Sequence, residues 1–147
     1  GMYTELYLGL KFKEDVLKEL IDLFVPGTVL EPPDIFKNHK LFHCSRWHHL
    51  FLSGGSYYFD AKSQIKIEFD KITKCYHLNL VVNIKNYEGE IEKFLDFIGP
   101  FIDTTGHIGH FRYEKDFCPT LLFMNQQQVK KFDPETTNFK MFFGIEE

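Results

Sequence analysis

The amino-acid sequence predicts an α+β protein in which an antiparallel sheet carries two helices on one face. Two segments, 2–12 and 72–85, show the alternation of apolar and polar residues that is typical of half-buried strands. Two other segments, 16–24 and 87–102, repeat apolar residues at helical spacing. The order along the chain is therefore strand, helix, strands, helix and further strands.

The 147 residues are interpreted as one domain, 1–147. A single core of this size buries roughly 68–70% of the surface that the unfolded chain exposes, so the fold needs neither a metal ion nor a disulfide. Nothing in the composition marks a domain boundary. Gly1 precedes Met2 and is interpreted as a residue left by cloning.

The first predicted element is a strand over 2–12, because the even-numbered residues from Leu6 to Phe12 are apolar. A helix is expected over 16–24, and the Pro-Gly pair that follows it should end it. Residues 26–40 contain three of the six prolines and are predicted to form a loop across the surface.

The middle of the chain is predicted to form strands. Segments 42–52 and 56–61 have strand signals and are joined by the sequence SGGS, which suits a hairpin turn. Residues 65–69 alternate as well. The clearest strand lies within 72–85, and its polar face carries Cys75, His77, Asn79 and Asn83. Such one-sided strands predict an antiparallel sheet with one apolar and one polar face.

The second helix is expected from about residue 87 to the Gly-Pro pair at 99–100, because proline removes an amide and clashes with the preceding turn. Two more strands are predicted at 107–114 and 119–125. Together with the earlier elements, this order predicts a ferredoxin-like topology with extra strands.

The C-terminal segment 136–147 contains five large apolar residues after a loop signal. Leaving each of them in water would forgo about 1.5–3 kcal/mol. We therefore expect this segment to pack on its own domain or on a second subunit.

Charge and composition argue against several classes of partner. The net charge is −4 and the only arginines are Arg46 and Arg112, so a nucleic acid is not expected. No run of eighteen apolar residues predicts a membrane span. The three cysteines lie far apart, which is typical of reduced thiols, and we expect a cytoplasmic protein.

The segment 39–49 concentrates histidines around the single tryptophan, Trp47. In a helix, His39/His43 and Cys44/His48 would be i, i+4 pairs, a spacing that lets two side chains share a zinc ion. In a strand, Cys44 and His48 would lie about 13 Å apart at roughly 3.3 Å per residue, too far for one ion. The β-prone residues favour a strand with structural or surface histidines, and a metal site is the alternative.

The candidate ligand-binding residues are His77, Asn79, Trp47, His49, His110 and Arg112. A polar sheet face needs water, another layer or a partner above it, which is why His77 and Asn79 are included. In the strand 107–114, simple alternation puts His107 on one side, and Ile108 and His110 on the other. Its glycines allow a close approach of another backbone or of a ligand.

The motifs that mark common enzyme classes are absent: the sequence has no GxSxG, P-loop, GxGxxG or HExxH. No catalytic residue and no cofactor is therefore assigned. The sequence favours a small non-enzymatic binding or protein-interaction domain, whose partner is a protein or a small molecule. A homodimer formed by sheet packing is a further hypothesis. The alternative function is a small enzyme or metal-binding protein that uses the histidines of 39–49.

Overall fold

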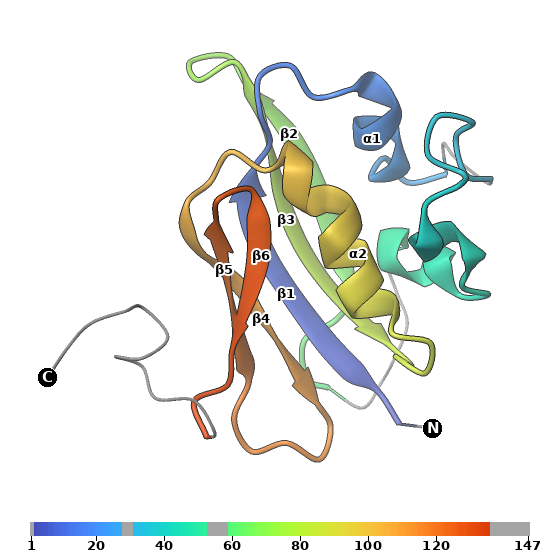
Figure 1. The fold of residues 1–147 in the computed structure, drawn as a ribbon, viewed down its shortest axis with the longest axis vertical. Coiled ribbons are helices and arrows are strands. Elements are labelled where there is room, and N and C mark those ends of the chain that lie inside the picture. Colours follow the sequence, from blue (N-terminus) through green and yellow to red (C-terminus); the bar gives the residue numbers. More distant parts are fainter. Residues whose placement is uncertain (1, 28–30, 53–58, 136–147) are drawn as a thin grey trace, which may run out of the picture.

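The computed structural model describes residues 2–27, 31–52 and 59–135. These residues form an α+β structure with a six-stranded antiparallel sheet in the order β2-β3-β1-β4-β5-β6 (Figure 1). The strands are β1 (Thr4–Lys11), β2 (Gln64–Asp70), β3 (Cys75–Ile84), β4 (Gly106–Tyr113), β5 (Thr120–Asn125) and β6 (Gln128–Phe132). The helices are α1 (Lys18–Leu23) and α2 (Glu90–Ile98), with short 3-10 helices η1 (Lys40–His43), η2 (Trp47–Phe51) and η3 (Gly99–Phe101).

Strand β1 lies in the middle of the sheet, between β3 and β4. Leu8 is opposite Leu80 of β3 and Gly109 of β4. The apolar residues of β1 and the phenylalanine that follows it are buried as the alternation predicts: Leu6, Leu8, Leu10 and Phe12. Because successive strand residues point to opposite faces, the residues between them lie on the other face of the sheet.

Helix α2 crosses in front of the sheet in Figure 1 and contributes to the same core. Ile91, Phe94 and Ile98 are fully buried, and so are Leu80 and Val82 of β3. The predicted apolar stripe is therefore confirmed. The Gly-Pro pair ends the α-helix as expected, and the chain continues into η3.

The strand predicted at 42–52 is wrong, because this region forms η1 and η2. Each short helix buries two adjacent apolar residues in the core, Leu41 and Phe42 in η1 and Leu50 and Phe51 in η2. Local β-propensity is weaker than this packing against the rest of the core. Of the predicted hairpin, residues 53–58 lie outside the described part of the chain, and 59–61 form a bend.

Strand β6 was not among the predicted strands. It pairs with β5 through a tight turn in which Gln126 and Gln127 have positive φ angles of 52° and 66°. Turns of this type usually contain asparagine or glycine, so three consecutive glutamines did not predict a hairpin. The predicted packing of the segment 136–147 lies outside the described residues.

Candidate binding groove on the sheet face

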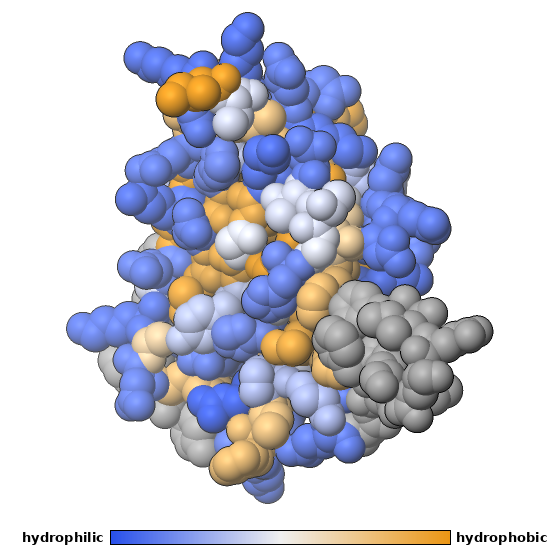
Figure 2. Space-filling view, turned by 90° about the vertical axis from the view of Figure 1, so that its left-hand side faces the viewer, coloured by the Kyte–Doolittle hydropathy of each residue, from blue (hydrophilic) through white to orange (hydrophobic). Residues whose placement is uncertain are grey.

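The sheet face that carries Tyr7 and Gly9, opposite the buried apolar residues of β1, is hollowed. Two adjoining hollows of about 770 Å³ and 530 Å³ share Gly9 and Asn79, and we call them together the sheet groove. Figure 2 looks toward the side of the molecule with β4, β5 and β6, and shows apolar surface enclosed by hydrophilic residues. Side chains that line the groove include Tyr7, Lys11, Gln64, Lys66, Thr73, His77, Asn79, Val81, Asp103, Thr104 and His107.

Gly9 makes the groove deep at its centre. It lies between Tyr7 and Lys11 on the same face of β1 and pairs with Asn79 of β3. A Cβ atom added at Gly9 would lie 3.6 Å from Asn79 Oδ1, which is ordinary contact. The backbone therefore does not require glycine at this position, and the missing side chain is what leaves the space open.

Two side-chain amides beside this space are available to a ligand. Asn79 and Gln64 are exposed, and neither side chain forms a hydrogen bond within the described part of the chain. Lys66 is also exposed, and its Nζ lies 3.2 Å from Glu68 Oε1 of the same strand. Amides both donate and accept hydrogen bonds, so this wall can recognise either kind of polar group.

Tyr7 and His110 stack at one side of the groove, because the register of β1 and β4 places them opposite each other. Their ring centroids are 4.7 Å apart and their planes are inclined by 23°. The Tyr7 hydroxyl donates a hydrogen bond of 3.4 Å to Glu5 Oε2. Arg112 Nη2 lies 3.9 Å from Glu5 Oε1, and its guanidinium also covers the ring of Phe59 at 5.2 Å.

Burial controls the ionisation of this cluster. It raises the pKa of Glu5, an effect that the charge of Arg112 opposes. It also raises the pKa of Tyr7, with the charge of Glu5 adding to the shift. The pKa of His110 is lowered, first by burial and then by the charges of His107 and Arg112. At neutral pH the stacked pair therefore consists of a neutral imidazole and a protonated phenol.

Gly109 permits the close contact between β4 and β1. A Cβ atom at this position would overlap the carbonyl oxygen of Tyr7, so no other residue fits without moving a strand. The prediction that glycines here allow a close approach of another backbone is confirmed for Gly109, but not for Gly106, where an added Cβ would meet nothing within 4 Å.

A register shift between His107 and Gly109 corrects the predicted facing of this strand. His107 pairs with Phe123 and His110 with Leu121, so both histidines lie on the groove face, whereas Ile108 is buried. The extra residue of a β-bulge breaks the alternation from which the opposite facing was predicted.

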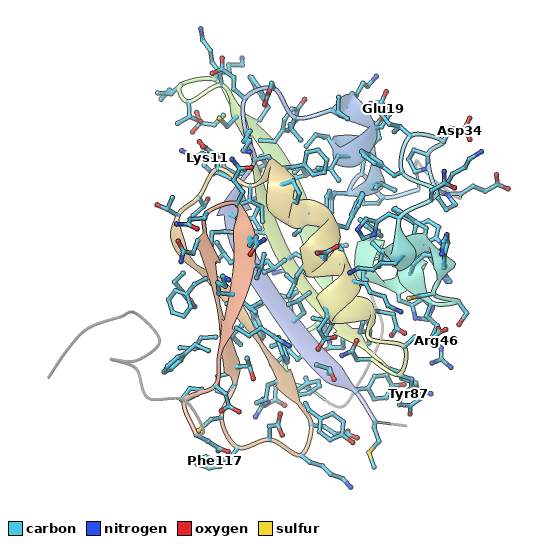
Figure 3. The ribbon with its side chains drawn as sticks, viewed as in Figure 1. Lys11, Glu19, Asp34, Arg46, Tyr87 and Phe117 are labelled. Atoms are coloured by element: carbon cyan, nitrogen blue, oxygen red, sulfur yellow. The ribbon has the colours of Figure 1, made fainter. Side chains whose placement is uncertain are left out.

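The second hollow brings His77 and Lys11 toward the loop that follows η3. Lys11 Nζ lies 3.5 Å from Asp103 Oδ2, and the Lys11 amide donates a 2.8 Å hydrogen bond to Thr104 Oγ1. Figure 3 shows Lys11 at this end of the molecule, and the exposed Phe117 at the opposite end. His77 Nε2 lies 3.7 Å from Asp70 Oδ2, too long for a hydrogen bond.

The structure brings together some of the predicted ligand-binding residues and separates others. His77 and Asn79 line the groove, His110 adjoins it, and Arg112 lies at the Glu5 cluster. Trp47 and His49 are elsewhere, on η2, where the Trp47 ring packs edge-on against Phe42 with centroids 5.0 Å apart. These two residues therefore do not contribute to the groove.

The polar face of β3 is less exposed than its sequence suggests. Cys75 and Asn83, at the two ends of the strand, are both buried. The Asn83 amide donates 3.3 Å hydrogen bonds to Ala61 O and Ser63 Oγ. Only the middle of this face, around Asn79, faces the groove. The buried Glu5 and the role of Gly9 were missed, because alternation shows which side a residue takes but not what lies across from it.

The histidines of 39–49 are dispersed. His39 accepts a 3.0 Å hydrogen bond from the Leu41 amide and lies 3.2 Å from Asp96 Oδ2, while Cys44 is buried with Lys93 Nζ 3.6 Å from its sulfur. The rings of His48 and His49 meet edge-on. Within residues 2–27, 31–52 and 59–135, no group of three or more His, Cys, Asp or Glu side chains is placed to hold a metal ion.

A further hollow of about 640 Å³ lies between the outer face of α2 and the β5–β6 turn, lined by Glu92, Asp96, Gln127 and Lys131 among others. It contains none of the predicted ligand-binding residues. The sheet groove is therefore the stronger candidate site, because two predicted residues of β3, His77 and Asn79, line it and His110 of β4 adjoins it.

Comparison of the chain with protein-family models, curated proteins and solved structures gave no match. Among the described residues, the helices are all too short or too polar to cross a membrane.

Proposed function

We propose that this protein is a non-enzymatic binding domain and that the sheet groove is its ligand-binding surface. The observation that carries the proposal is the meeting of two hollows over Gly9, beside the exposed amide of Asn79, which forms no hydrogen bond with the described residues. The larger hollow, about 770 Å³, falls within the range of roughly 300–1,000 Å³ that is usual for small-molecule sites.

The chemistry of the groove favours a flat small molecule with an apolar body and polar edges. Val81 and the backbone at Gly9 offer an apolar floor, and Tyr7 offers an aromatic wall. Gln64 and Asn79 offer hydrogen bonds to amide, carbonyl or hydroxyl groups of the ligand. Hydrogen-bonding groups beside an apolar surface fix the orientation of a ligand without requiring a charge.

We also infer a ferredoxin-like topology enlarged by β5 and β6. The order β2-β3-β1-β4, with α1 after β1 and α2 after β3, supports this inference. In such an arrangement both helices cover one face of the sheet, which leaves the opposite face for a ligand. A cytoplasmic location is part of the proposal, and the free state of all three cysteines supports it.

The alternative function, a small enzyme or metal-binding protein that uses the histidines of 39–49, has less support. His39 is engaged by Asp96 and by the Leu41 amide, and Cys44 is buried. Neither side chain is directed with the other histidines toward a shared centre among the described residues.

The proposal is tested by NMR with a library of small aromatic amides and phenols. Fragments that bind should shift the backbone amide signals of Gly9, Asn79 and Val81 in the ¹⁵N-labelled full chain. Gly9→Leu, which fills the groove, should abolish these shifts, whereas Gly9→Ala should retain them. The proposal would be contradicted by fragments that shift only the amide signals of residues lining the hollow between α2 and the β5–β6 turn. Fragments that shift none of the signals of Gly9, Asn79 and Val81 would contradict it as well.

A further inference from the structure

Strand β2 is one edge of the sheet, and its outer side has no strand beside it in the described structure. Apart from the ladder with β3, no backbone hydrogen bond within the described part of the chain involves residues 64–69. A strand edge with unpaired amides and carbonyls is a template for another strand.

The side chains of β2 alternate strictly between charged or polar and apolar. Gln64, Lys66, Glu68 and Asp70 lie on the groove face, because they pair with Val81, Asn79, His77 and Cys75 of β3. Ile65 and Ile67 pack against the core but are only partly buried, and Phe69 is 50% exposed. The edge therefore leaves apolar surface uncovered next to the core.

We propose that β2 pairs with β2 of a second copy of this chain, antiparallel, about a twofold axis at Ile67. In this register Lys66 of each copy lies opposite Glu68 of the other on the groove face. On the core face, Ile65 of each copy lies opposite Phe69 of the other, and the two Ile67 side chains meet. The charges of Lys66 and Glu68 are then paired, Asp70 faces the uncharged Gln64, and the exposed Phe69 gains an apolar neighbour.

Symmetry and charge select this register. A twofold axis perpendicular to the sheet keeps the groove-face residues of both copies on one continuous face. Such an axis must pass between a residue of β2 and the same residue in the second copy. Centring the axis on Lys66 would oppose two ammonium groups, and centring it on Glu68 would oppose two carboxylates. Like charges directly opposite each other disfavour pairing. Only the Ile67 register makes every charged pair in the centre of the strand complementary.

The other edge of the sheet lacks this complementarity. β6 carries the adjacent residues Lys130 and Lys131, both exposed, and no acidic residue. Lysines on an edge strand are a common protection against unwanted pairing. This contrast between the two edges is the reason that we place the contact between copies at β2 and not at β6.

The test uses charge reversal and the molar mass of the full chain in solution, measured by analytical ultracentrifugation from about 1 µM to 1 mM. The wild-type chain should dimerise within this range. Lys66→Glu and Glu68→Lys should each weaken self-association at least about tenfold, because each opposes like charges twice. The double variant Lys66→Glu/Glu68→Lys should restore it.

A mixture of the two single variants gives the sharpest outcome. One variant has glutamate at both positions 66 and 68 and the other has lysine at both, so opposite charges face each other in a mixed dimer. The mixture should form a heterodimer at concentrations at which each variant alone is monomeric. Matched thermal melts of all variants show that the fold is intact, since both residues are exposed. A monomer at every concentration, or a dimer indifferent to these charges, would overturn the proposal. Neither result bears on ligand binding at the groove, which is measured separately.

Discussion

The two faces of the sheet are built from the same strands but are filled differently. On the face of Leu8 and Leu80, side chains of α2 close the space, and the residues there are almost fully buried. On the face of Gly9 and Asn79, one position has no side chain and the other is an exposed amide. Adjacent residues of β1, and likewise of β3, thus lie on opposite faces, one in the packed core and the next at an open groove. The comparison teaches that neighbouring residues of one strand divide between packing the core and lining an open surface.

The largest expected effect comes from the core face. Leu80→Ala should lower the free energy of unfolding by about 2–5 kcal/mol, since it leaves a cavity under α2. The neighbouring change Asn79→Ala should stay within about 0.5 kcal/mol, because that side chain is exposed and forms no hydrogen bond with the described residues. Urea denaturation of both variants measures the difference. Equal effects would show that the faces are assigned wrongly.

Gly109 provides the next test, because the backbone of β1 leaves no room for a Cβ atom at this position of β4. Gly109→Ala should destabilise the protein by about 2–3 kcal/mol, since its methyl group would overlap the Tyr7 carbonyl and push the two strands apart. Thermal unfolding followed by circular dichroism would measure this change. A variant as stable as the wild type would disprove the close contact.

Substitution of Gly9 by alanine should change stability in the opposite direction to substitution of Gly109. Its backbone needs no positive φ, and an added Cβ meets only Asn79 Oδ1 at 3.6 Å. Gly9→Ala should therefore stabilise the protein by about 0.5 kcal/mol, because alanine loses less conformational freedom in a strand. The same unfolding experiment applies, and a clear loss of stability would mean that the groove is closed at this point.

The smallest expected effect concerns pH. Burial lowers the pKa of His110 in the folded protein, with the charges of His107 and Arg112 adding to the shift. Below the ordinary histidine pKa of about 6.5, the unfolded chain therefore binds a proton that the folded chain does not. Stability from this residue is complete above that pH and is lost as the pH falls toward the folded pKa.

His110→Gln should accordingly make stability less dependent on pH in the window just below about 6.5. Urea midpoints of the variant and the wild type at several pH values within this window provide the measurement. The other groups of the cluster, Glu5 and Tyr7, are common to both proteins and cancel in the comparison. An unchanged slope would show that His110 titrates normally.

The sequence allowed the central elements to be predicted because their periodicity is strong. β1, β3 and α2 each place at least three apolar residues on one side, and burial follows that pattern. The elements that were missed depend on information from elsewhere. η1 and η2 form because their apolar pairs fit the core beside α2, and β6 forms after a turn of glutamines with unusual backbone angles.

The candidate site was predictable only in part for the same reason. Asn79 and His77 follow from the polar face of one strand. Gly9 becomes important only once β3 is known to lie beside β1, since its value is the space it leaves next to Asn79. The bulge near Ile108 determines that His107 and His110 share a face, and simple alternation does not include it, although a glycine such as Gly109 within a strand often marks a bulge.

The most direct test of the central claim is calorimetric titration with the best-binding aromatic amide fragment against three full-length proteins: wild type, Gly9→Ala and Gly9→Leu. If the ligand occupies the sheet groove, Gly9→Ala should bind with a nearly unchanged Kd, and Gly9→Leu should bind at least about tenfold more weakly, a loss of about 1.4 kcal/mol. Thermal melts should show both variants folded. Equal Kd values for all three proteins would contradict binding at the groove.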